Sequence, residues 1–176
     1  HINGGRATNP PLTVVEELDT AAAASLTAGA QLAVHEPSFQ NLRELKILLE
    51  ARAMYAAFIA HNIRAGLALF ALHKHAEFAA FRKGLDTGIA ALRQAVTAAA
   101  RFESCQTDLF GAVIQFGRGV DAAGVEASLQ EWTELREMLI RNKKAFPDFA
   151  CYAAALNCYI TTRAHIRPFR IYTDEL

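Results

Sequence analysis

The sequence contains one cluster of histidines, His73 and His75, and Glu77 follows two residues later. On a helix, His73 and Glu77 lie on one face because they are four residues apart, while His75 points elsewhere. An imidazole and a carboxylate on one face can supply two ligands to a metal ion. His73 and Glu77 are therefore the metal candidates. The competing interpretation is that they are ordinary surface side chains near a helix end.

Three glutamates recur every third residue around the single tryptophan, Trp132: Glu131, Glu134 and Glu137. Paired carboxylates perform the acid–base chemistry of glycoside hydrolysis. Carboxylates along one outward helical face more often serve solvation and ion pairing, here with Arg136 and Arg141. We interpret the three glutamates as such a face and predict no catalytic residue.

Two further groups are candidates for interaction rather than catalysis. Phe116-Gly117-Arg118-Gly119 lacks the spacing of a phosphate-binding loop, yet Arg118 could bind an anion or a sugar hydroxyl; the alternative is a structural turn. His61, Asn62 and Arg64 interrupt an apolar segment. They indicate either a buried hydrogen-bonded network or a face that meets another domain. The full set of interaction candidates is His61, Asn62, Arg64, Phe116, Arg118 and Trp132.

The amino-acid composition limits the classes of partner that we expect for this protein. The chain has 176 residues, of which 52% are hydrophobic, with 18 Lys+Arg and 18 Asp+Glu. Without a basic excess we expect no nucleic-acid binding. The most apolar stretch, Ala51 to Leu72, contains Arg52, His61, Asn62 and Arg64, so we predict no membrane span. No motif predicts a cofactor.

The three cysteines do not define a disulfide framework. Cys151 and Cys158 are seven residues apart on a predicted helix, roughly 10 Å along its axis, which is too far for a mutual disulfide. Cys105 could pair with either of them, but buried free thiols are the favoured interpretation. The final residues, Thr173-Asp174-Glu175-Leu176, only loosely resemble an endoplasmic-reticulum retrieval signal.

The residues from Phe39 to Phe81 include no proline and one glycine, Gly66. This pattern predicts one helix about 60 Å long, or two helices with a slight break. Gly84 is the expected end of that region, and Asp86 or Thr87 the expected cap of the next helix, which should end near Phe102. The other expected segments are a helix over 13–33, an irregular loop over 104–124, a helix over 122–143 and a fifth helix from Pro147 to just before Pro168.

These segments predict an all-α fold, an antiparallel bundle of about five helices organised on one very long central helix. Residues 1–12 are expected to form an extended arm, 13–167 the helical domain and 168–176 a C-terminal tail.

The order of several motifs resembles that of a helical accessory domain in bacterial polysaccharide-degrading enzymes of the glycoside hydrolase type. The matching motifs are Leu42-x-x-x-Lys46-x-Leu48-Leu49-x-Ala51-Arg52, Asn62-Ile63-Arg64-Ala65-Gly66 and Trp132-x-x-Leu135. The resemblance covers about residues 10 to 145. Gln130-Glu131 stands where the family pattern has Gly-His before the tryptophan. The acidic pair of such an enzyme lies in a separate barrel, so no catalytic residue is carried over.

The leading functional hypothesis is therefore a non-catalytic domain that packs against, or borders, the catalytic domain of a carbohydrate-active enzyme. Its partner would be that domain or another protein subunit, with carbohydrate as a further candidate ligand. The alternatives are a stand-alone helical scaffold for protein assembly and a small helical-bundle metal-binding protein. The resemblance implies a secreted or periplasmic protein; without it, a cytoplasmic one is expected. The sequence leaves open whether the chain is an enzyme.

Overall fold

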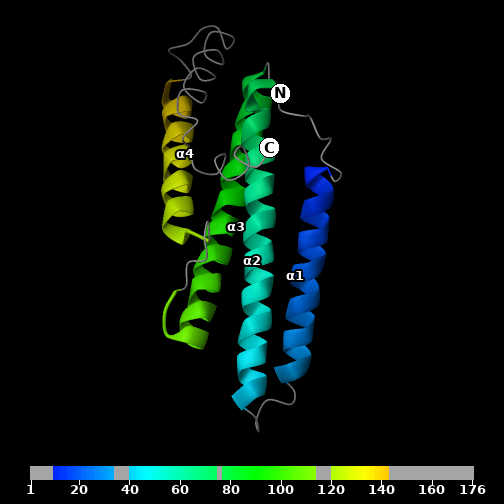
Figure 1. Cartoon of the computed structure of the whole chain (residues 1–176). Coiled ribbons are helices and arrows are strands. Elements are labelled where there is room, and N and C mark those ends of the chain that lie inside the picture. Colours follow the sequence, from blue (N-terminus) through cyan, green and yellow to red (C-terminus); the bar gives the residue numbers. More distant parts are fainter. Residues whose placement is uncertain (1–9, 34–39, 75–76, 114–119, 143–176) are drawn as a thin grey trace, which may run out of the picture. The chain divides into compact units, whose positions relative to one another are not determined.

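The computed structural model describes residues 10–33, 40–74, 77–113 and 120–142. These residues form an all-α structure without strands, which confirms the predicted fold class. The four α-helices are α1 (Pro11–Ala33), α2 (Gln40–Phe70), α3 (Phe78–Phe110) and α4 (Ala122–Asn142), and a 3₁₀ turn, η2 (Ala71–Lys74), follows α2 (Figure 1). The described part thus holds four α-helices, not five. The expected arm over 1–12 lies outside it except for its last three residues, and the fifth helix and the tail over 168–176 lie outside it completely.

The prediction of one continuous helix over Phe39–Phe81 is wrong, whereas the alternative of two helices with a break agrees with the structure. Helix α2 ends at Phe70, the η2 turn follows, and α3 begins at Phe78. Leu72, within the turn, is only 1% exposed. Burial of a leucine side chain contributes roughly 1.5–3 kcal/mol, enough to offset the helical hydrogen bonds lost where α2 stops. No glycine or proline occurs at this break, so the sequence carries no local signal for it.

The expected helix junction at Gly84 is also wrong, because α3 is continuous from Phe78 to Phe110. Gly84, Asp86 and Thr87 all lie inside α3, and the Thr87 hydroxyl donates a hydrogen bond to the Lys83 carbonyl, 2.8 Å away, within the helix. The side chains proposed as caps therefore lie in a helix interior.

The expected loop over 104–124 is also mostly wrong, since α3 continues to Phe110. Gly111 then adopts φ +70° and its N–H donates to the Thr107 carbonyl at 2.8 Å, which is the left-handed helix stop that glycine favours. The helix predicted over 122–143 is confirmed as α4. Asp121 caps it, because its carboxylate accepts the Gly124 N–H at 2.9 Å.

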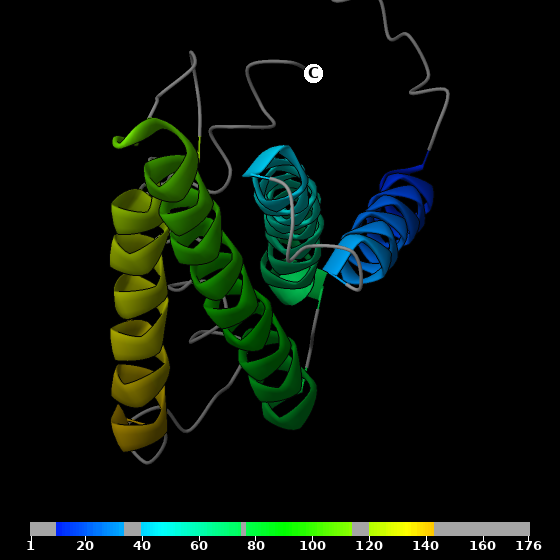
Figure 2. The same ribbon diagram turned by 90° about the horizontal axis from the view of Figure 1, so that it is seen from below.

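The contacts divide the chain into two compact units. The first contains α1, α2 as far as Ile63 and α3 from Ala98. Helices α1 and α2 lie side by side in Figures 1 and 2, and Gly29 of α1 faces Leu49 of α2. The core of this unit consists largely of small side chains. Its buried alanines are Ala51, Ala53, Ala56, Ala60, Ala98 and Ala99.

The second unit contains the end of α2 from Arg64, α3 as far as Thr97, and α4. Helices α3 and α4 run side by side in both views (Figures 1 and 2). Its core is built on large side chains, of which Leu69, Leu85, Leu92 and Trp132 are each at most 2% exposed. Leu69 packs so closely on Gly88 that a Cβ there would lie 2.5 Å from the leucine Cδ2 and 2.6 Å from its Cγ.

By length and composition alone, one helix of the described part could cross a membrane. It covers Asn41–Phe70 with a mean hydropathy of 1.2, and 44% of its most apolar window is buried within the chain. Core helices of soluble proteins satisfy the same criterion, so the absence of a membrane span stays a prediction.

The two glycines near the α2–α3 contact should respond oppositely to alanine. Gly88→Ala is expected to destabilise the fold by about 1–3 kcal/mol, because the buried Leu69 has little room to move away. Gly66→Ala, where a Cβ meets nothing within 4 Å, is expected to stabilise it by about 0.5–1 kcal/mol. Urea unfolding of both variants measures the difference, and equal midpoints would contradict the close Gly88–Leu69 contact.

Candidate functional site

The two metal candidates, His73 and Glu77, do not lie on a common helix in the structure. His73 lies in the η2 turn and Glu77 lies just before α3, so the two do not share one helix face. Glu77 is exposed. Among the residues that the structure describes, no three His, Cys, Asp or Glu side chains gather as a metal site. The assignment of His73 and Glu77 stays a prediction without a geometric basis.

The polar residues in the middle of α2 are partly drawn into the core. Asn62 is 2% exposed, and its amide Nδ2 donates to the Phe58 carbonyl at 3.1 Å. Its buried Oδ1 accepts no hydrogen bond from the described residues. His61 and Arg64 are half-buried. A buried acceptor without a donor costs about 1–3 kcal/mol, so Asn62 fits the predicted buried network only in part.

Trp132 is a core residue of the second unit. It is 1% exposed, and its indole N–H, also buried, has no acceptor within the described ranges. It therefore offers no open aromatic surface in the described structure on which a sugar ring could stack. The other two interaction candidates, Phe116 and Arg118, lie outside the described residues.

The glutamates around Trp132 behave as a solvated face. Glu131, Glu134 and Glu137 are all exposed. Glu134 accepts a hydrogen bond from Gln130 at 2.9 Å, and Glu137 pairs with Arg141 at 3.0 Å. These are exposed contacts one helical turn apart, worth at most a few tenths of a kcal/mol each.

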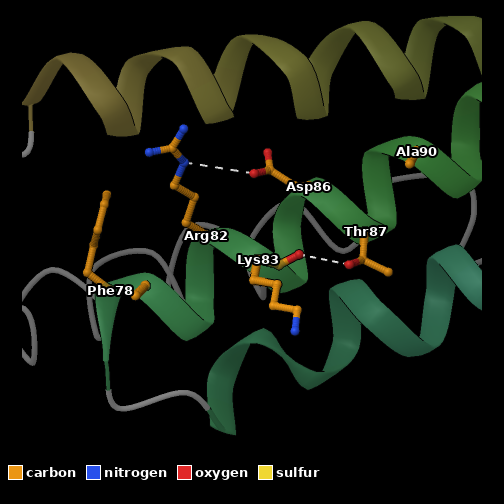
Figure 3. Close-up of a pocket in the computed structure, with 7 residues that line it drawn as sticks. Phe78, Arg82, Lys83, Asp86, Thr87 and Ala90 are labelled. Atoms are coloured by element: carbon orange, nitrogen blue, oxygen red, sulfur yellow. Dashed lines mark hydrogen bonds and ion pairs between the residues drawn. The ribbon is translucent and has the colours of Figure 1, made fainter.

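The structure instead reveals an open groove of about 610 Å³ along the first half of α3, beside α4 (Figure 3). Sequence reasoning missed it, because the region was expected to be a helix junction. We name it the α3 groove. Its described lining residues are Phe78, Ala79, Arg82, Lys83, Asp86, Thr87 and Ala90.

The carboxylate of Asp86 in the α3 groove forms ion pairs with two guanidinium groups. Arg136 of α4 donates a short hydrogen bond to it, and Arg82 lies 3.8 Å away on the next turn of α3. The contact with Arg136 links α3 to α4 across the second unit.

A second inter-helix ion pair lies in the first unit, next to the one cysteine that the structure describes. Arg101 of α3 donates to Glu50 of α2 at 2.6 Å, and this hydrogen bond raises the pKa of the Arg101 guanidinium. Cys105, one turn further along α3, is 0% exposed and free. Burial, assisted by the nearby Glu50, raises the pKa of its thiol. The thiol therefore stays protonated and is not an activated nucleophile.

The first unit also carries large apolar side chains on its surface. Leu45, Leu48 and Tyr55 of α2 follow each other at helical spacing and are 42%, 53% and 46% exposed. The Tyr55 ring is packed against Phe102 of α3, with ring centroids 5.6 Å apart. We name these three side chains of α2 the outer stripe. The exposed, charged Arg52 lies between Leu48 and Tyr55 on the same helix.

The chain matches no protein-family model, and comparison with curated proteins and with solved structures finds no significant match.

The burial of Cys105 can be tested by alkylation. At neutral pH, modification of Cys105 in the folded chain should be at least 100-fold slower than in denaturant, because the thiol is buried and its pKa is raised. Peptide mapping by mass spectrometry separates Cys105 from Cys151 and Cys158. Since the unfolded thiol ionises first, the stabilisation linked to Cys105 is complete below the ordinary thiol pKa. It is lost as the pH rises through the higher folded-state pKa. Native labelling as fast as in denaturant would contradict the buried position.

Proposed function

We propose that this chain is a non-catalytic helical module that packs against a separate protein domain through the outer stripe. The observation that carries the proposal is the exposure of Leu45, Leu48 and Tyr55 in a unit whose own core is built largely of alanine. Adjacent large apolar side chains at a protein surface are typical of interaction sites. The absence of a ligand cluster among the described residues agrees with a supporting role.

For the identity of the partner, we propose the catalytic domain of a carbohydrate-active enzyme. This step depends only on the resemblance of the sequence motifs, two of which, Leu42–Arg52 and Asn62–Gly66, lie on α2. The sugar-binding and catalytic groups would then belong to the partner domain, and a secreted or periplasmic location follows.

The same stripe supports a second candidate, a helical scaffold that assembles with other subunits or with itself. Sedimentation velocity of the purified chain distinguishes the two. A concentration-independent monomer favours the accessory module, whereas reversible self-association favours the scaffold. The metal-binding alternative has no such observation behind it, and metal analysis of wild-type and His73→Ala protein purified without chelators decides it.

Charge substitutions in the outer stripe test the proposal in two settings: the isolated chain and the complete product of its native gene. In the isolated chain, Leu48→Glu should change stability by less than about 0.5 kcal/mol, because Leu48 is already half exposed. In the complete product, the same change should cost about 1.5–3 kcal/mol, because a covering domain would bury the side chain. Differential scanning calorimetry measures both.

The control is Leu12→Glu on α1, where the side chain is 62% exposed. It should be neutral in both settings. Equal tolerance of Leu48→Glu and Leu12→Glu in the complete product would rule out the outer stripe as the docking surface. A gene that encodes no further domain would rule out the accessory-module proposal.

A further inference from the structure

The outer stripe belongs to a longer row of side chains on α2, in which the spacing alternates between four and three residues. Such alternation places side chains at the a and d positions of a heptad, in one line along the helix. All members of the row are exposed except the last, which is half-buried. We name the row the α2 seam, and it consists of Asn41, Leu45, Leu48, Arg52, Tyr55 and Ile59.

The α2 seam is narrow. Ala51 and Ala56 flank it on opposite sides by helical spacing, and both are only 6% exposed. From Asn41 to Ile59 the seam extends over about 27 Å of helix. A strict a and d pattern of this width is typical of a helix that packs lengthwise against one other helix, whereas a broader apolar face covers a larger core.

Arg52 places a positive charge at the centre of the α2 seam, with two apolar seam positions before it and two after it. Within the part of the chain that the structure describes, Arg52 has no ion-pair partner, whereas Arg101 is paired with Glu50. An element that covers the seam removes water from the guanidinium, and a buried charge without a partner is costly. A carboxylate is the group that fits a guanidinium best, because it accepts two parallel hydrogen bonds.

We propose that the occupant of the outer stripe is a single α-helix of the separate domain, packed lengthwise on the α2 seam and presenting an aspartate or glutamate to Arg52. This inference rests on the proposed function, since it assumes that such a domain docks on the outer stripe. Arg52 then determines specificity and register. Only a helix with an acid at the matching position satisfies the guanidinium, and a slip of one turn separates the two charges.

A second copy of this chain does not supply the required acid. A parallel copy in register would place Arg52 against the same arginine. An antiparallel copy would place Arg52 against one of the d positions of the seam, which are uncharged: Asn41, Leu48 and Tyr55. Glu44, at the edge of the seam, already takes part in an interaction within the chain. The seam is therefore better matched to a different, acidic helix than to itself.

Carbodiimide cross-linking of the complete gene product tests the proposal. Arg52→Lys keeps the positive charge and adds a primary amine, which should form an amide with an Asp or Glu of the other domain. The matched control is Arg43→Lys, because Arg43 is also exposed but lies nine residues away, on the opposite side of α2. The control should give at least tenfold less of the cross-link. Peptide mapping by mass spectrometry identifies the joined residues.

Charge reversal gives a second measurement, which decides the question if the reagent does not reach the contact. In the complete product, Arg52→Glu should lower the unfolding midpoint by at least about 4 °C more than Arg43→Glu, because it places two acids against each other. In the isolated chain the two variants should differ by less than about 2 °C, since both side chains are exposed. Differential scanning calorimetry measures all four samples.

A cross-link from Arg52→Lys to a helix of the other domain, or the larger effect of Arg52→Glu, supports the inference. Equal effects of Arg52→Glu and Arg43→Glu in the complete product would overturn it, as would a main cross-link to a second copy or within residues 1–176. If Leu48→Glu still destabilises the complete product in that case, docking on the outer stripe stands and only the acidic helix is wrong. If Leu48→Glu is tolerated as well, the proposed function fails and this inference fails with it.

Discussion

The described structure depends on close contact between helices that carry small side chains. Nine of the 22 buried hydrophobic residues in the described ranges are alanines, and Gly88 lies directly beneath Leu69. Small residues let helix backbones approach closely, but each buried alanine removes little apolar area from water. A core of this kind therefore holds its helices together with less hydrophobic free energy per residue. It also leaves larger side chains on the outside: eleven large hydrophobic residues in the same ranges are exposed, among them the outer stripe.

Buried polar groups without hydrogen-bond partners lower the stability of both units further. Asn62 in the first unit and Trp132 in the second each bury a hydrogen-bonding atom that finds no partner in the described structure. Each such atom costs about 1–3 kcal/mol. Natural proteins tolerate a few such groups, most often where another element, a water molecule or a ligand satisfies them. Both residues were interaction candidates from the sequence, and both are buried. The presence of an asparagine and a tryptophan at these positions is therefore explained by their place in the core.

The sequence predicted the helices well where local chemistry sets their limits. Asp121 caps α4 through its own side chain, and the predicted helix over 122–143 agrees with α4 to within a residue. The same local reasoning failed at the break after Phe70, where no glycine or proline marks the end of α2 and Leu72 is buried in the turn that follows. Gly84 misled the prediction, since glycine is tolerated inside a helix, whereas Gly111 is the true stop. The α3 groove could not be predicted, because it arises when α3 is continuous across Gly84 and α4 lies beside it.

Alanine faces, which dominate the core of the first unit, make close contact possible but do not select one register, because one small side chain packs much like the next. Register then comes from contacts that occur once, and the large core side chains of the second unit supply further contacts of this kind. In the second unit these are the Leu69–Gly88 contact and the Asp86–Arg136 pair; in the first unit the Glu50–Arg101 pair has this role. Both ion pairs are partly exposed, so each adds no more than about 1 kcal/mol to stability. Their main contribution is geometric, because a slip of one turn along α3 would separate both partners of each pair. Contacts that are weak but occur only once thus fix the register of the helices, which repetitive alanine packing leaves undetermined.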